Sequence, residues 1–350
     1  MNKFWSSMVK RTDPYVPGEQ LNQPDLLKLN TNENPYPASP KVLEAIQEEL
    51  DTLKLYPSPT ADQLRAEIGS HFGLDSRNVF IGNGSDEVLA FSFMAFFEPG
   101  QTIRFPAVTY SFYPVYAKLF DISYEETPLN DDFTIQTDAF FESKGGVIFP
   151  NPNAPTSIYL PLHSVKEILD HNPDKIVIVD EAYIDFAGES ASALIPEYEN
   201  LLVIQTTSKS RSLAGLRVGY ALGQEHLINA LIRIKDSFNS YTIDRLALAG
   251  ALASFKDVGY FKEHTTKIIK TRVSVSEKLQ ALGFNIIPSS ANFLFVTHPE
   301  KEAETLYLEL KERNVLVRHF GKKPIDNYLR ITIGTDQEMH RLIETLVAII

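Results

Sequence analysis

The sequence predicts an α/β protein with a large domain, built on a mostly parallel sheet flanked by helices, and a smaller α+β domain at the C-terminal end. Two observations carry this prediction. Short runs of β-branched and aromatic residues alternate with helical or loop segments between residues 61 and 222. One of these runs, 176–179, is apolar at every position, as a strand buried on both faces should be.

The elements follow in order from this pattern. The first 40 residues are rich in proline and lack periodicity, so we expect an arm that lies on a larger body. A helix is predicted over 61–72 and strands over 79–81, 102–105, 147–149, 176–179, 201–204 and 218–222. A long helical stretch, 242–282, is followed by strands near 293–296, 315–317 and 329–333 and by helices near 301–313 and 336–349. The expected units are therefore the arm, 1–40, a large domain, 41–250, and a small domain, 251–350.

Composition excludes several classes of function. The chain has 350 residues and no cysteine, which rules out thiol catalysis and cysteine-bound metals. Its net charge of −12 argues against a nucleic-acid partner. No apolar run approaches the about 18 residues of a membrane span, and the N-terminus does not resemble a signal peptide, so we expect a cytoplasmic protein with no membrane partner.

A glycine-rich turn at 82–87 follows the predicted strand 79–81. Its free N–H groups, with Ser85 as the helix N-cap, favour an anion site and above all a phosphate site. The dinucleotide fingerprint does not fit, because Glu87 stands where its third glycine belongs and Arg104 where its acidic residue belongs. A structural turn without a ligand is the alternative.

Three other strand ends carry reactive or polar groups. Asp180 ends a buried strand, where it could pair with a protonated heterocycle, bind a metal with nearby acids or cap a turn. Lys209 is an isolated lysine among small residues, which indicates a nucleophilic amine or an ordinary surface lysine. Arg217 follows it and could bind a phosphate. Asn151 and Asn153 could donate to a ligand oxygen or form Asx turns.

One cofactor, pyridoxal 5′-phosphate, needs this whole set of groups. Its aldehyde requires a lysine, its pyridine nitrogen a carboxylate, its phosphate backbone amides and an arginine, and its ring oxygen a donor. The motifs NPNAPT, DEAY and SKSRSLAGLRVGY occur in the order found in the fold-type I pyridoxal-phosphate aminotransferases, which the sequence resembles over nearly its whole length. PYVPG, NENP, LYP and GNGSDE are most similar to the histidinol-phosphate aminotransferase subfamily.

The resemblance implies roles for individual residues. Lys209 would form the Schiff base with the cofactor and move protons, Asp180 would pair with the pyridine nitrogen, and Tyr183 would bind the ring oxygen O3′. The remaining cofactor-binding residues would be Gly84, Ser85, Asp86, Tyr110, Asn153, Thr206, Ser208, Arg217 and Tyr56. The implied substrate-binding residues are Tyr15, Asn32, Tyr56, Asn292, Arg318 and Arg330, and no metal is expected.

The implied activity is transamination between L-histidinol phosphate and 2-oxoglutarate by a ping-pong scheme, which belongs to histidine biosynthesis. An aromatic amino acid aminotransferase, or a phosphoamino-acid decarboxylase, is the alternative. The resemblance also implies a homodimer in which Tyr56 reaches the neighbouring active site, and an arm that contributes to the small domain and the active site.

Three positions depart from the family pattern. Ala154 replaces an asparagine that contacts O3′, so either Asn153 substitutes for it or Tyr183 holds O3′ alone. Ser157 stands in place of a glycine. Arg211 replaces an aromatic residue, and we expect it to face solvent, with the phosphate site as the alternative.

Overall fold

The structure is a computed structural model that describes residues 3–21 and 23–350. Its largest sheet has the strand order β2-β8-β7-β6-β5-β3-β4. All neighbouring strands are parallel except β8, which runs antiparallel to both β2 and β7. The bounds are β2 Val79–Asn83, β3 Thr102–Pro106, β4 Ser123–Thr127, β5 Val147–Pro150, β6 Val177–Asp180, β7 Leu201–Thr206 and β8 Val218–Gly223.

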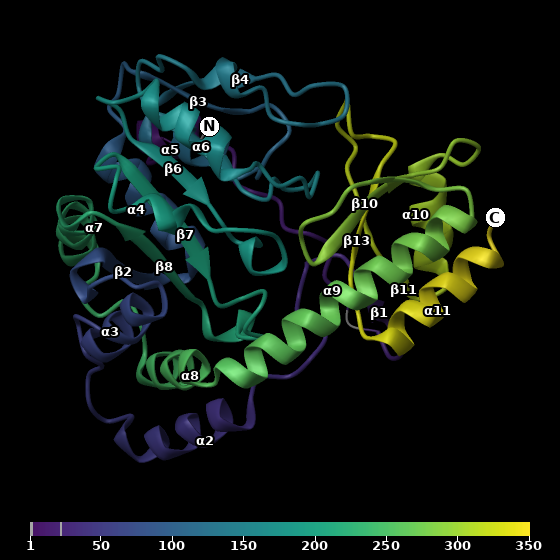
Figure 1. The fold of residues 1–350 in the computed structure, drawn as a ribbon, viewed down its shortest axis with the longest axis horizontal. Helices are drawn as coiled ribbons and strands as arrows, with labels where there is room; N and C mark the ends of the chain where they lie inside the picture. The colour runs from purple at the N-terminus through teal and green to yellow at the C-terminus, as the bar shows by residue number, and fades with distance from the viewer. Residues whose placement is uncertain (1–2, 22) are drawn as a thin grey trace.

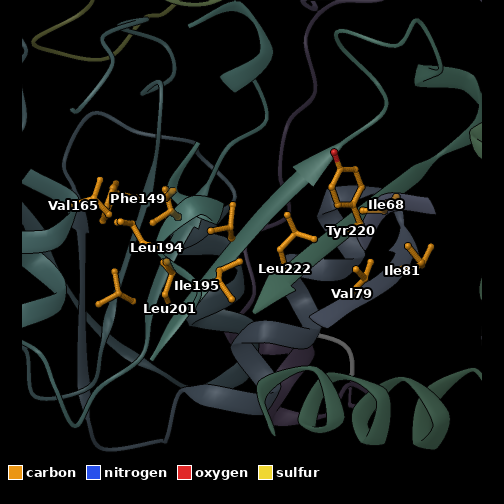
Figure 2. Close-up of a cluster of buried hydrophobic side chains, with 14 of the residues drawn as sticks. Ile68, Val79, Ile81, Phe149, Val165, Leu194, Ile195, Leu201, Tyr220 and Leu222 are labelled. Atoms are coloured by element: carbon orange, nitrogen blue, oxygen red, sulfur yellow. The ribbon is translucent and has the colours of Figure 1, made fainter. Parts of the chain in front are cut away.

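Helices cover both faces of this sheet because successive side chains of each strand point in opposite directions. Val177 and Val179 pack on one face with the helices α3, α6 and α8, and Ile178 packs on the other with α4, α5 and α7. Figure 2 shows part of the first layer, in which Val79 and Ile81 lie near Ile68 of α3. The bounds are α3 Asp62–His71, α4 Gly84–Phe96, α5 Tyr113–Phe120, α6 Leu162–Asp170, α7 Glu225–Phe238 and α8 Arg245–Lys256.

The C-terminal part is built on a second sheet, with the strand order β12-β13-β10-β9 and antiparallel pairing throughout. The long helix α9, Val258–Ala281, runs from the first sheet toward this part (Figure 1). The other bounds here are β9 Asn285–Ile287, β10 Phe293–Thr297, α10 Ala303–Glu312, β11 Val315–Leu316, β12 Arg318–His319, β13 Leu329–Thr332 and α11 Asp336–Val347.

The N-terminal arm joins both parts of the molecule. It holds the short helix α1, Ser7–Arg11, and the strand β1, Leu27–Lys28, before α2 begins, Pro40–Glu49. β1 pairs in parallel with β11, so the arm belongs to the C-terminal part. Short 3₁₀ turns lie at η1 Leu50–Thr52, η2 Ser76–Asn78, η3 Thr137–Phe140, η4 Ile184–Phe186, η5 Ala191–Leu194 and η6 Ala214–Leu216.

The fold class and the predicted strands of the large sheet are confirmed, whereas two predictions about other elements need correction. The sequence reading missed β4, whose residues are mostly polar because it is an exposed edge strand. The predicted helix 242–282 is wrong, because it is two helices that meet at Asp257, where the carboxylate accepts hydrogen bonds from Ser39 Oγ (2.5 Å) and Lys41 Nζ (3.1 Å). The predicted domain division after residue 250 falls inside α8 and stays a prediction. Among the described residues, every helix is too short or too polar to span a bilayer.

Candidate active site

The strand ends singled out in the sequence meet at one edge of the large sheet. A cavity of about 310 Å³ opens there, because the parallel strands β2, β5, β6 and β7 all end at this edge. The cavity brings together most of the predicted cofactor residues: Ser85, Asp86, Tyr110, Asp180, Tyr183, Thr206, Ser208, Lys209 and Arg217.

One end of the cavity is formed by the start of α4. The first N–H groups of a helix have no acceptor within the helix, so they point at whatever lies before it. Gly84 has φ +76°, and a Cβ there would lie 2.5 Å from Nη2 of Arg217. A Cβ on Gly219 would lie 2.3 Å from the backbone nitrogen of Ser85. Both glycines therefore let β8 and its arginine approach the helix start.

Hydrogen bonds within the protein hold the arginine and the two hydroxyl groups at this end of the cavity. Arg217 Nη2 donates to Asp86 Oδ2 at 3.0 Å. Thr206 Oγ1 donates to Ser208 Oγ at 3.0 Å, and the Ser208 N–H donates to Thr206 Oγ1 at 3.1 Å. An arginine, two hydroxyls and a helix N-terminus are the groups that bind a phosphate.

Asp180 lies at the buried centre of the cavity. Its Oδ2 accepts the Tyr113 hydroxyl at 2.9 Å and its Oδ1 accepts the Ala182 N–H at 3.3 Å. Burial nevertheless raises the pKa of Asp180 to about 6. Among the described residues Asp180 takes part in no ion pair, so no cationic side chain balances the charge of its carboxylate.

Lys209 lines the same cavity as Asp180, beside Tyr183 and Thr31 of the arm. Its Nζ donates to the Thr31 carbonyl at 3.2 Å and lies 5.9 Å from the centre of the Tyr183 ring. The Tyr183 hydroxyl accepts a hydrogen bond from Asn32 Nδ2 at 2.9 Å. The amine is thus held by one neutral acceptor, which leaves it available for chemistry.

A second cavity, of about 170 Å³, continues from the first past Lys209. It is lined by Tyr15, Asn32, Arg318 and Arg330, among others. Arg330 donates from Nη2 to the Asn30 carbonyl at 2.7 Å, whereas its buried Nε has no partner, and burial lowers the pKa of its guanidinium. This cavity therefore offers two cations to an anionic ligand.

Four predicted site residues lie outside both sets of lining residues: Gly84, which begins α4, and Tyr56, Asn153 and Asn292. Tyr56 is 79% exposed on the surface, against Tyr241. The Asn153 amide donates to the Val108 carbonyl and Thr156 Oγ1, and the Asn292 amide donates to the Asn32 carbonyl. The buried Oδ1 atoms of Asn153 and Asn292 have no partner. Their roles stay predictions.

The expectation that Arg211 faces solvent is wrong. Its guanidinium carbon lies 3.7 Å from the centre of the Phe255 ring and 4.2 Å from that of Phe261, and Nη1 donates to the Ser254 carbonyl at 3.0 Å. The buried arginine thus packs against two aromatic rings, which the sequence alone did not reveal.

The acidic neighbours of Asp180 do not form a metal site. Glu181 is buried and accepts hydrogen bonds from Ser190 Oγ, the Ala191 N–H and Gln205 Nε2. Within the described part of the chain no group of three acidic or histidine side chains could hold a metal ion.

The sequence reading also missed Thr31, Glu33 and Tyr113 as site residues, although Tyr113 follows Tyr110 by only three residues.

The fold and the site agree with a comparison against known proteins. A model of the family "Aminotransferase class I and II" matches residues 24–346. The chain belongs to this aminotransferase family.

Two relatives of this aminotransferase are described as histidinol-phosphate aminotransferases. The protein from Oceanobacillus iheyensis is 59% identical, with 100% of this chain and 99% of the relative covered. The protein from Clostridium acetobutylicum is 54% identical, with 99% of each covered. The structure of histidinol-phosphate aminotransferase from Sinorhizobium meliloti in complex with pyridoxal-5′-phosphate superposes with a TM-score of 0.87 at 22% identity, covering 100% of this chain and 99% of that one, which shows the shared fold.

The cavity of this aminotransferase fits pyridoxal 5′-phosphate on its own geometry. A buried carboxylate without a cation suits a protonated pyridine nitrogen, and the helix start, the Arg217 guanidinium and the Thr206 and Ser208 hydroxyls suit a phosphate. The Lys209 amine suits the aldehyde. The residues present therefore match each end of the cofactor.

Proposed function

We propose that this chain is a histidinol-phosphate aminotransferase, which transfers the amino group of L-histidinol phosphate to 2-oxoglutarate and releases imidazole acetol phosphate and L-glutamate. The observation that carries the proposal is the 59% identity, over the full chain, to a protein of that name. The two arginines beside Lys209 support it, because both substrates are anions and a guanidinium binds phosphate and carboxylate alike.

In this proposal, Lys209 would hold pyridoxal 5′-phosphate through a Schiff base. Asp180 would pair with the ring nitrogen, Tyr110 would pack on the ring and Tyr183 would donate to O3′. Gly84, Ser85, Asp86, Thr206, Ser208 and Arg217 would surround the phosphate. The common position of all these residues but Gly84 around one cavity supports the roles, and Gly84 begins the helix at that end. Asn153 has both amide hydrogens engaged elsewhere, which favours Tyr183 as the group at O3′.

When bound, the cofactor supplies an electron sink that stabilises negative charge at the substrate's Cα. The protein's own groups do the rest. Once the amino donor has taken its place on the cofactor, the freed Lys209 amine would take the proton from Cα of the donor, because Lys209 lines both cavities. Asp180 is buried, and its anionic carboxylate would stabilise a positive charge on the ring nitrogen of the cofactor.

We propose that Arg330 and Arg318 bind the phosphate of one substrate and the carboxylates of the other, with Tyr15, Asn32 and Asn292 around them. Asn32 links this pocket to the cofactor pocket through its hydrogen bond to Tyr183. Asn32, Lys209 and Arg330 come from the arm, the large domain and the small domain predicted from the sequence, so all three units build one site.

We also propose a homodimer in which Tyr56 completes the neighbouring active site. Its support is a run of exposed apolar side chains around Tyr56, with exposed fractions between 47% and 79%: Leu43, Leu50, Leu53, Leu55 and Tyr56. Such a surface is typical of a protein interface. Sedimentation of the wild type should give a dimer, and Tyr56→Phe should weaken cofactor binding while the dimer persists. A monomer with full activity would contradict this.

The decisive experiment is an assay of the purified protein with 2-oxoglutarate and, separately, histidinol phosphate, phenylalanine and tyrosine as donors. We expect glutamate formation fastest with histidinol phosphate. Faster turnover of phenylalanine would favour an aromatic aminotransferase. Lys209→Ala should abolish turnover with all three donors and prevent borohydride from attaching the cofactor to the chain, with the fold retained. Normal turnover by that variant would overturn the proposal.

A further inference from the structure

Three tyrosine hydroxyls from one short segment contact two acidic residues of the cofactor cavity, Asp86 and Asp180. Tyr110 donates to Asp86 Oδ1 at 2.8 Å and Tyr116 to the Asp86 carbonyl at 2.9 Å. Tyr113 donates to Asp180 Oδ2 at 2.9 Å. Tyr113 and Tyr116 lie three residues apart on one face of α5, and Tyr110 belongs to the turn before it, where its carbonyl accepts the Tyr113 N–H at 3.2 Å. The segment therefore touches both the phosphate end and the ring-nitrogen end of the cavity.

Tyr113 differs from the other two because its hydroxyl is buried against a carboxylate. Its side chain is fully buried, and its ring packs edge-on against Phe105, with centroids 5.9 Å apart, and Tyr110, at 5.8 Å. These contacts leave the hydroxyl one position, in which it donates to Asp180. A hydrogen bond to a buried charged group is among the stronger ones in proteins.

The two donors to Asp180 come from different elements and hold different oxygens. The Tyr113 hydroxyl holds Oδ2 and the Ala182 N–H holds Oδ1, so the carboxylate plane cannot rotate without losing one of them. The Ala182 contact is long, at 3.3 Å, which leaves Tyr113 as the stronger restraint. A fixed, charged carboxylate is what the ring nitrogen requires.

We propose that Tyr113 is a positioning residue, whose hydroxyl orients Asp180 and keeps it charged toward the ring nitrogen of bound pyridoxal 5′-phosphate. This inference rests on the proposed function, because it assumes that the cofactor occupies the cavity. A tyrosine that only filled the core would act through its ring, and phenylalanine would replace it without loss. The hydroxyl and the ring can therefore be separated by one substitution.

The test compares two ligands on cofactor-free protein. Pyridoxal 5′-phosphate and its 1-deaza analogue, which has carbon in place of the ring nitrogen, are titrated by absorbance into wild type and Tyr113→Phe. We expect the substitution to raise the dissociation constant for pyridoxal 5′-phosphate about tenfold and that for the analogue less than about twofold. An equal change for both ligands, or no change, would overturn the inference.

Tyr116→Phe is the matched control. It removes a hydroxyl from the same helix face, but one that binds the backbone of Asp86 rather than Asp180. We expect this variant to change the binding of both ligands by the same factor. A selective loss of pyridoxal 5′-phosphate in Tyr116→Phe, equal to that of Tyr113→Phe, would show that the effect does not pass through Asp180 and would overturn the inference.

A second variant covers the case in which Tyr113→Phe does not fold because Asp180 has lost its donor. The double variant Tyr113→Phe, Asp180→Asn removes the buried charge as well, so we expect it to fold. A double variant as unfolded as the single one would contradict the pairing. If wild type itself bound no pyridoxal 5′-phosphate, the proposed function would fail together with the inference, whereas equal losses in Tyr113→Phe would refute the inference alone.

Discussion

Ser157 holds a backbone conformation that favours glycine. Its φ is +66°, in the left-handed region, and the residue is fully buried. A residue with a side chain loses about 1–2 kcal/mol of stability in this region. Glycine avoids this cost, but it loses more conformational entropy on folding, which offsets part of the gain. We therefore expect Ser157→Gly to raise the free energy of unfolding by about 0.5–1 kcal/mol, measured by urea denaturation.

Ser157→Ala serves as the comparison, because it removes the hydroxyl and keeps the Cβ. The Ser157 hydroxyl donates to the Thr156 carbonyl, so alanine should gain nothing and lose this contact. Equal stability of the glycine and alanine variants would show that the backbone conformation carries no cost.

Glu181 should make the cofactor-free protein less stable as pH rises. Burial raises the pKa of Glu181 from its ordinary value of 4.5 to about 7. Between these two values the folded state binds a proton that the unfolded state has lost, so the stabilising effect is complete below about pH 4.5 and disappears as pH rises through 7. Glu181→Gln should therefore gain stability relative to wild type from pH 5 to pH 8. A difference that is constant across that range would contradict the assigned pKa.

Single residues show where the sequence suffices for the site and where it does not. Lys209 and Asp180 could be predicted because each directly follows an apolar strand, and the edge of a parallel sheet gathers such residues. Tyr113 and Arg211 could not, because their roles depend on partners far away in the chain. Tyr113 binds Asp180, and Arg211 packs on Phe255.

The junction of β8 with α4 depends on close backbone contact between two elements. At Gly219 a Cβ would lie 2.3 Å from the Ser85 nitrogen and 2.4 Å from the Gly84 carbonyl carbon, so the strand and the helix would have to separate. We expect Gly219→Ala to lower the free energy of unfolding by about 1–3 kcal/mol. It should also weaken cofactor binding, because the displaced helix start belongs to the predicted phosphate site.

Gly215→Ala is the matched control for this element. It lies four residues earlier, and a Cβ there would meet no atom within 4 Å. Thermal unfolding and cofactor titration should leave this variant close to wild type. If Gly219→Ala behaved in the same way, the close approach would have no energetic importance.

Elements were predictable where their own residues carry the pattern. The strands buried on both faces carry continuous apolar runs, 177–179 in β6 and 201–204 in β7, and helical periodicity located α3. The edge strand β4 and the break between α8 and α9 were not predictable. β4 is polar because one side of it faces solvent, and the break at Asp257 is held by residues of the distant α2 region.

For the whole molecule, net charge and site charge have opposite signs. The chain carries −12, whereas the entrance cavity, about 450 Å³ in volume, shares Tyr15 and Arg318 with the substrate cavity and has a net positive lining. Its charged lining residues are Lys118, Arg318, Lys322 and Lys323 against Asp13 and Glu126. A positive entrance raises the local concentration of anions, and salt screens this effect. We expect the double variant Lys322→Gln, Lys323→Gln to lower kcat/KM about 2–5-fold at low salt, with kcat unchanged and the difference lost at high salt.

The control removes the same charge elsewhere. Lys270 and Lys278 are exposed on α9, and neither lines the entrance cavity. Lys270→Gln, Lys278→Gln should leave the salt dependence of kcat/KM unchanged, as measured with histidinol phosphate. The same response in both double variants would assign the effect to total charge rather than to the entrance.

The pairing of β1 with β11 has a consequence for biosynthesis on the ribosome. Leu27 aligns with Val315, so the arm has no strand partner until almost the whole polypeptide has been translated. The large sheet, which ends at Gly223, can assemble earlier. Nascent chains stalled before residue 315 should therefore carry an unpaired β1 segment that proteases cut readily, although Arg11 can already bind the Lys118 carbonyl of α5, and Thr31, which contacts Lys209, should reach its position last. The active site would then be complete only when synthesis ends, so the reactive Lys209 amine would not act while the chain is unfinished.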